Sequence, residues 1–366
     1  MRARDTSWSS GEREKSLAIA DGRAGRCGSW FHEYDVSSTG PLALVLGLHE
    51  TDRYLGSIAR AGETWSAASL TSLSILLQLP VTTADPRLPA TTSVGRTALS
   101  VTELAPMIAF YRTVVGLAVQ SRSVECATLG AGGVSLLELT TALEAGERQG
   151  AGLFHVAFRF PSRVALGEAL DRVRTHGELD GATDHGVSEA LYLRDPEDNG
   201  VELYRDRPRG EWPVAADGRL RMETDPLDLA GIAEAASELS TSRPAQAPPG
   251  TDVGHVHLEV TDLERARRFY VETLGLNVRQ TMGEAALFLA AGDYHHHVGL
   301  NTWNGRTEPS SGRGLSWVEL RVPESAAVVA ARQRFADAGV EVDDRPGGIE
   351  VADPDGIRLR LVAASS

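Results

Sequence analysis

Histidines at repeated positions are the residues of this sequence best suited to chemistry. In the stretch 253–276, apolar residues alternate with His255, His257 and Glu259, which is the period of a strand with two different faces. A second strand of the same kind carries His155. An imidazole can bind a metal ion or move a proton near neutral pH. These strands therefore direct attention to metal or acid–base chemistry.

Three consecutive histidines, His295, His296 and His297, follow in a strand-like run that we expect to span residues 295–300. Alternation along a strand lets only one parity of residues face a cavity. Aligning residues 131–138 with 291–298 puts His296 on the same face as Glu138, whereas a shift of one residue would put His295 and His297 there. A strand whose histidines are only structural is the alternative.

The strands that carry these histidines belong to a repeat that runs from residue 94 onward. Four segments open with similar strands, at 95–101, 154–160, 254–260 and 316–322. A helix pattern follows each strand, and shorter strand-like runs come after it, which predicts four βαβββ modules. A module of roughly fifty residues cannot bury both of its faces alone. We therefore expect an α+β fold in which modules pair into curved mixed sheets, with helices outside and a cavity inside.

The same repeat divides the chain. Residues 1–90 form an N-terminal extension without a recognisable pattern, and its His32 and His49 receive no role. Residues 91–206 would hold modules one and two, and residues 251–366 would hold modules three and four. The linker 207–250 contains a helix pattern at 227–239 and a segment rich in Ser, Pro and Ala.

Charge and hydropathy exclude several partners for these 366 residues. The net charge of −14 argues against nucleic acid, because phosphate binding needs a basic surface. No apolar run is long enough to cross a bilayer, and residues 1–15 lack the apolar core of a secretory signal. We therefore expect a cytoplasmic protein with no nucleic-acid or membrane partner. Homo-oligomer formation is left open.

Three motifs resemble the vicinal oxygen chelate superfamily, which contains glyoxalases, bleomycin-resistance proteins and extradiol dioxygenases. They are the strand His-Val-x-Leu-x-Val, a helix that ends in Phe-Tyr-x-x-x-Leu-Gly-Leu, and the closing Asp-Pro-x-x-Asn-Gly-Val-Glu-Leu. The resemblance covers about residues 94–364. Within it, residues 184–192, 206–209 and 294–303 resemble the four-module bacterial catechol 2,3-dioxygenases.

The resemblance implies metal ligands at two positions of a module, in the opening strand and at the Glu of the closing strand. Module two offers His155 and Glu202, and module three offers His255. If modules two and three pair, these residues form the 2-His-1-carboxylate set of non-haem Fe(II) enzymes, with Mn(II) as the alternative ion. Pairing module one with two and three with four would leave each half with an incomplete set.

The resemblance also implies residues that handle protons and oxygen. His296 is the acid–base candidate, and Tyr192, ten residues before Glu202, resembles the tyrosine that hydrogen-bonds a substrate oxygen. His185 lies in a loop that could close the site. Packed or surface roles are the alternatives for both, and His257 could orient a ligand or be packed.

Aromatic residues could line a substrate cavity or belong to the core, namely Phe154, Tyr294, Trp303 and Trp317. In modules one and four, Arg96 and Arg360 stand where ligands would be expected and could pair with Glu138.

The function that this resemblance implies is an extradiol ring-cleaving dioxygenase, which opens a catechol-type diol with Fe(II) and O2. One alternative is a glyoxalase-like metal-dependent isomerase or lyase, whose sites usually take a fourth protein ligand. The other alternative is a metal-free small-molecule binding or resistance protein of the same fold.

Overall fold

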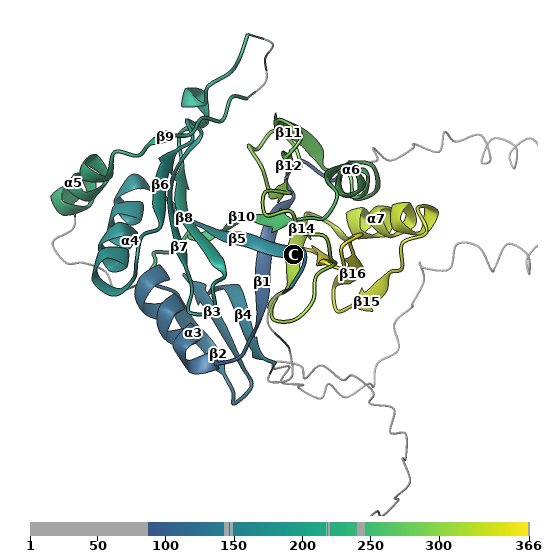
Figure 1. Ribbon diagram of the computed structural model, residues 1–366, viewed down its shortest axis with the longest axis horizontal. Coiled ribbons are helices and arrows are strands. Elements are labelled where there is room, and N and C mark those ends of the chain that lie inside the picture. The colour runs from purple at the N-terminus through teal and green to yellow at the C-terminus, as the bar shows by residue number, and fades with distance from the viewer. Residues whose placement is uncertain are drawn as a thin grey trace, which may run out of the picture. The chain divides into compact units, whose positions relative to one another are not determined.

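The repeated pattern folds into two curved β-sheets with helices on their outer faces (Figure 1). This computed structural model describes residues 87–364 except 143–145, 147, 148, 217, 219 and 240–245. The expectations for residues 1–86, including His32 and His49, lie outside the described residues.

Each module contains one strand, one helix and three further strands, so the predicted α+β fold of four βαβββ modules is confirmed. Module one contains β1 (Ser93–Val101), α3 (Leu104–Phe110), η1 (Tyr111–Val115), β2 (Ala118–Arg122), β3 (Cys126–Ala131) and β4 (Val134–Thr141). Module two contains β5 (Gly152–Arg159), α4 (Arg163–His176), β6 (Gly181–Asp184), β7 (Ser188–Arg194) and β8 (Gly200–Asp206). Module three contains β10 (Asp252–Glu259), α6 (Leu263–Arg267), η3 (Arg268–Thr273), β11 (Asn277–Met282), β12 (Ala286–Ala290) and β13 (Val298–Asn301). Module four contains β14 (Gly314–Val322), α7 (Ser325–Asp337), β15 (Asp343–Arg345), β16 (Gly348–Ala352) and β17 (Arg358–Ala363).

The sheets pair module two with module three, and module one with module four. In the nine-stranded sheet, β5 and β10 are antiparallel neighbours at the centre, and in the eight-stranded sheet β1 and β14 take that place. Both pairs of opening strands lie side by side in the middle of Figure 1. Each sheet therefore contains strands from both 91–206 and 251–366. The division of the chain into two domains with these bounds stays a prediction.

Side chains of the helical segments join module one to module two and module three to module four. The Tyr111 hydroxyl of module one donates to Asp195 Oδ2 of module two at 2.9 Å. The Tyr270 hydroxyl of module three donates to Asp353 Oδ2 of module four at 3.0 Å. Burial, together with the aspartate beside it, raises the pKa of each tyrosine well above its usual value, so both keep their protons and hold these contacts.

The helices of modules one and three widen into π-helical turns, which the sequence pattern did not predict. Gly116 N donates to Tyr111 O, and Leu274 N donates to Phe269 O at 2.8 Å, so each bond spans five residues. Asp262 caps the start of α6 through a 2.8 Å bond from Arg265 N, as its residue type predicts. Gly275, with φ 96°, ends η3 in the left-handed conformation that glycine favours.

One apolar core runs through all four modules and includes the buried side chains of Val101, Val156, Leu258 and Leu320. These alternate with the inward-facing polar residues of the same strands, as a sheet with two different faces requires.

The linker contributes η2 (Arg209–Glu211), β9 (Asp225–Pro226) and α5 (Leu229–Leu239). The helix predicted at 227–239 is thus confirmed, and α5 packs against α4 (Figure 1). Within the described ranges, none of the helices combines the length and the apolar character that a membrane crossing needs.

Candidate functional site

The inner face of the nine-stranded sheet gathers polar side chains from four strands. His257 of β10 lies opposite His155 of β5 in the antiparallel register, and His255 lies two residues away on the same face. Glu202 of β8 is aligned with Ala157, two residues beyond His155, and lies opposite Tyr192 of β7. Because side chains two residues apart share a face, the sheet register alone brings these five residues together.

His155, His255 and Glu202 converge on one point. Their candidate ligand atoms all lie within 4.8 Å of one another. Glu202 Oε2 lies 3.0 Å from His155 Nε2 and 3.1 Å from His255 Nε2, and the two imidazole nitrogens are 3.3 Å apart. All three side chains are buried. The pairing of modules two and three produces this convergence.

The spacing of these atoms fits a single ion. Ligand atoms about 2.1 Å from a metal lie roughly 3.0 Å apart when their bonds meet at right angles and roughly 3.4 Å apart in a tetrahedron. The observed separations of 3.0, 3.1 and 3.3 Å match ligands that occupy one face of a coordination sphere. Two imidazoles and one carboxylate in that arrangement are typical of non-haem Fe(II).

The protonation states also suit metal binding, which needs neutral imidazole and ionised carboxylate. Burial lowers the pKa of His255 to about 4. Burial alone would raise the pKa of Glu202, but the adjacent His255 and His155 outweigh that effect and hold it well below its usual value. At neutral pH His255 therefore offers a neutral nitrogen and Glu202 a negative oxygen.

His257 packs beside this group. Its ring centroid lies 5.1 Å from that of His155. An added Cβ at Gly299 would come within 2.8 Å of the His257 ring, so only glycine lets β13 approach so closely. His257 Nε2 is buried and has no hydrogen-bond partner among the described residues.

Tyr192 and His185 form a second polar group at the edge of the site. His185 Nδ1 lies 2.7 Å from the Glu223 carbonyl oxygen, which can only accept, so this nitrogen carries the proton. In the neutral ring, His185 Nε2 then accepts from the Tyr192 hydroxyl at 2.8 Å. Burial and the negative Glu202 raise the pKa of Tyr192 well above its usual value. Tyr192 therefore remains a hydrogen-bond donor.

The expectation that His295, His296 and His297 lie in a strand was wrong. β13 begins only at Val298, and the three histidines occupy the bend before it. Parity therefore does not decide which ring faces the cavity, because the chain turns between β12 and β13. All three side chains are buried, and of the three only His296 lines the pocket around the candidate ligands.

A chain of hydrogen bonds supports His296. The Asp206 carboxylate can only accept, so His295 Nε2 donates to it at 2.9 Å. With neutral rings, His295 Nδ1 then accepts from His296 Nδ1 at 2.7 Å. This arrangement leaves His296 Nε2 without a proton. The imidazole of His296 lies close to that of His255, with ring centroids 4.1 Å apart and the ring planes tilted by 47°.

Asp206 is itself held in place by several donors. The Tyr294 hydroxyl donates to it at 3.1 Å and Arg159 NH1 at 3.0 Å. Burial alone would raise the pKa of Asp206, but the hydrogen bond from His295 and the charge of Arg159 hold it below its usual value. Neither Asp206 nor His295 was predicted to support the acid–base residue. Asp206 lies four positions after Glu202, on the same face of β8, and that spacing was the available signal.

The pocket that contains these groups has a volume of about 440 Å³. Of the four aromatic residues left open between cavity and core, Phe154 and Trp303 line the pocket, whereas Tyr294 packs under His295 and Trp317 lies in the other sheet. Further apolar lining comes from Val187, Met222, Met282 and Phe288.

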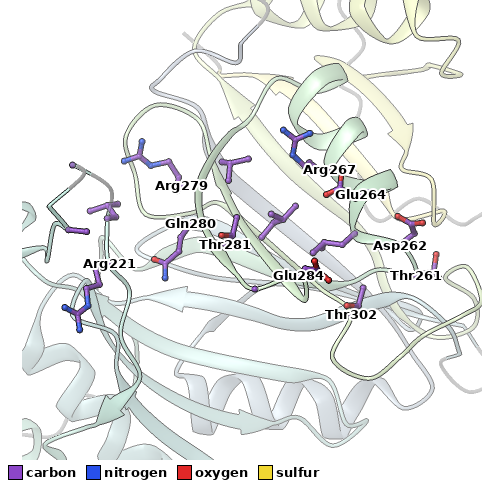
Figure 2. A pocket seen from close by; sticks show the side chains of 17 residues that line it. Arg221, Thr261, Asp262, Glu264, Arg267, Arg279, Gln280, Thr281, Glu284 and Thr302 are labelled. Atoms are coloured by element: carbon purple, nitrogen blue, oxygen red, sulfur yellow. The ribbon is translucent and has the colours of Figure 1, made fainter.

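A larger cavity of about 1130 Å³ lies between α6, β11 and the segment around Arg221, and Figure 2 shows charged and amide side chains around it. Among its described lining residues there is no histidine. The candidate ligand group of His155, His255 and Glu202 belongs to the smaller pocket.

The corresponding face of the eight-stranded sheet holds ion pairs. Arg96 pairs with Glu319 at 3.3 Å and Arg360 with Glu350 at 2.6 Å. Burial raises the pKa of Glu138, and the charges of Arg96 and Arg360 oppose that rise, so both arginines act on Glu138 although their direct ion pairs are with Glu319 and Glu350. Arg360 also lies 3.9 Å over the ring of Trp317.

Comparisons with known proteins agree with this geometry. The family model of the Glyoxalase/Bleomycin resistance protein/Dioxygenase superfamily matches residues 93–203 and 252–361. A catechol-2,3-dioxygenase of Bacillus subtilis (strain 168) is 37% identical over 271 residues, which are 72% of this chain and 94% of that protein. A solved structure from Bacillus subtilis subsp. subtilis str. 168 is similar in fold, with a TM-score of 0.54 and 13% identity over 75% of this chain and 86% of the other.

Proposed function

The chain belongs to the glyoxalase/bleomycin resistance protein/dioxygenase superfamily, and we propose that it is an extradiol ring-cleaving dioxygenase. Its substrate would be a catechol-type aromatic diol, which it would open beside the hydroxyl groups with O2. The relative named catechol-2,3-dioxygenase supports this reaction. The observation that carries the proposal is the buried group of His155, His255 and Glu202 in a pocket with apolar walls.

These three residues would hold Fe(II), with Mn(II) as the alternative ion. When bound, a ferrous ion supplies the redox chemistry by which an aromatic diol reacts with O2. In the described part of the chain, the group has three members and no fourth His, Cys, Asp or Glu joins it. This count favours the dioxygenase over a glyoxalase-like enzyme with four protein ligands.

His296 would act as the acid–base residue. Its Nε2 carries no proton in the arrangement set by Asp206 and His295, so it can accept one from a diol hydroxyl. The same nitrogen can return a proton to the ring-opened product. General acid–base catalysis of this kind contributes about 10²- to 10⁴-fold in rate.

Tyr192 and His185 would orient the diol. Tyr192 keeps its proton, as its raised pKa requires. Because that one proton points to His185 Nε2, the hydroxyl oxygen can accept a hydrogen bond from a substrate hydroxyl. His185 fixes the direction of that hydroxyl through the 2.8 Å contact.

The test uses the full chain, loaded with Fe(II) without oxygen, mixed with catechol and then exposed to O2. We expect a yellow ring-opened semialdehyde and consumption of O2 together with the diol. Metal uptake without O2 consumption would instead favour an isomerase or lyase. Failure to bind any of Fe(II), Mn(II), Zn(II) or Ni(II) would favour a metal-free binding protein.

A further inference from the structure

Building on the dioxygenase proposed above, we propose that the pocket selects diols that carry an uncharged apolar ring substituent. The surface that receives the substituent would consist of Phe288, Met282 and Trp303. A carboxylate-bearing diol would be a poor substrate.

The apolar surface leads from the reacting groups to the solvent. Phe288 lies with its ring centroid 5.1 Å from that of His296 and 5.7 Å from that of His257. His257 in turn lies 5.0 Å from Trp303. Trp303 and Met282 are both 44% exposed, so they form the rim. A substituent on a diol held beside His296 would therefore extend along rings rather than into water.

The backbone of Trp303 is held by hydrogen bonds, and its ring contacts those of Phe154 and His257. Its backbone N donates to Asn301 Oδ1 at 3.1 Å. Asn304 and Arg306 both contact the buried Glu259, the latter at 3.1 Å. A preorganised aromatic surface loses little conformational entropy on binding.

Met222 is fixed on another side of the pocket. Its backbone N donates to Gln280 Oε1 at 2.8 Å, and Gln280 Nε2 donates back to Met222 O at 3.3 Å. The loop that carries Met222 is therefore tied to β11. The pocket volume of about 440 Å³ falls in the range of about 300–1,000 Å³ typical of small-molecule sites, and a single bare ring would leave part of it empty.

The charges of the lining disfavour an anionic substituent. Arg194 is the one lysine or arginine among the described lining residues. It already pairs with Asp198 at 3.0 Å and with Asp180 at 3.7 Å. Asp180 and Glu223 also line the pocket. Glu223 is itself paired with Arg221 at 3.1 Å. A substrate carboxylate would thus find no unpaired lysine or arginine among the described lining residues.

The experiment compares catechol, 4-methylcatechol, 4-ethylcatechol and 3,4-dihydroxyphenylacetate on the Fe(II)-loaded full chain. Binding is measured without oxygen from the quenching of tryptophan fluorescence, and kcat/KM is measured with O2. We expect binding to tighten about fourfold for each added carbon, which is the value of a buried methylene. The carboxylate should bind on the order of tenfold more weakly than 4-ethylcatechol.

Two variants test whether the rim of the pocket determines the preference between the carboxylate and 4-ethylcatechol. Met282→Arg should improve binding of the carboxylate relative to 4-ethylcatechol, because it adds an unpaired cation at the rim. Val329→Arg is the matched control, since Val329 is exposed on α7 and does not line the pocket. It should leave the ratio unchanged.

The outcomes separate this inference from the proposed function. Equal or tighter binding of the carboxylate by the unaltered chain would overturn the inference, even if catechol is cleaved. Alkylcatechols that bind in the expected order without ring cleavage would support the inference and contradict the dioxygenase. Absence of binding by all four diols would overturn both.

Discussion

Asp206→Asn tests whether the hydrogen bonds that link His296 through His295 to Asp206 fix the tautomer in which His296 Nε2 carries no proton. Asp206 accepts from His295 Nε2, and His295 Nδ1 accepts from His296 Nδ1. An asparagine amide can donate to His295 Nε2, which would reverse both tautomers and put a proton on His296 Nε2. The same logic explains the effect of an aspartate-to-asparagine change behind the catalytic histidine of serine proteases.

The expected loss of kcat follows from the hydrogen bonds that must break. Restoring the working tautomer of His296 would cost two hydrogen bonds at about 0.5–1.5 kcal/mol each. The barrier would rise by about 1–3 kcal/mol, which lowers kcat by roughly 5- to 150-fold. KM for the diol and the bound iron should change little, because Asp206 lies outside the pocket lining and the ligand set.

Asp252→Asn provides the matched control. Asp252 accepts from the same Arg159, with bonds of 3.0 and 2.6 Å, but does not contact His295. Steady-state kinetics, iron content and thermal unfolding are measured for both variants. Equal losses of kcat in the two variants, or full activity of Asp206→Asn, would refute the proposed role of the chain.

Three further predictions concern the metal group and the histidines. Glu202→Gln should abolish stoichiometric metal binding, measured by elemental analysis, because a charged ligand is lost, whereas Glu319→Gln in the other sheet should retain it. His296→Ala should lower kcat about 10²- to 10⁴-fold. The Nδ1 of His297 accepts a 3.2 Å bond from Ala291 N, so His297→Ala should mainly lower the melting temperature. Similar kcat values in the two variants would count against His296 as the acid–base residue. The metal-free protein should lose stability as the pH falls from about 6.5 toward 4, because the unfolded chain binds a proton at His255 that the folded chain, with a pKa of about 4, does not. Urea unfolding at several pH values should give a slope of at least about 1.4 kcal/mol per pH unit, because the lowered pKa values of His257, His296 and His297 add to that of His255; a flat profile would contradict the pKa.

Much of the fold could be predicted because local pattern and tertiary structure agree. Alternation in residues 254–260 and the Gly275 stop define a strand and a helix that the structure contains. The convergence of His155, His255 and Glu202 follows from a repeat: equivalent positions in paired modules face the same cavity. Only the choice of pairing partner remained open, since sheet order depends on contacts far apart in the chain.

The parts that were not predicted depend on departures from regular structure. The run with His295, His296 and His297 was expected to be a strand, yet the chain bends there before β13. Alternation therefore could not identify the ring that faces the cavity. The contact between His295 and Asp206 joins residues 89 positions apart and has no local signal. The π-helical turns contain Tyr111 and Tyr270, whose hydroxyls donate to aspartates of neighbouring modules, and these long-range contacts also have no local signal.

The order of strands in the two sheets bears on how the protein is made. The imidazoles of His155 and His255 meet across 100 positions of the chain, and Arg96 reaches Glu319 across 223. Pairings of such high contact order form slowly. During synthesis, one edge of β1 therefore stays unpaired until β14 has left the ribosome. In that interval, self-association of the exposed edge competes with folding. Cutting the chain between its halves would separate His155 and Glu202 from His255, so neither fragment alone would assemble the complete ligand set.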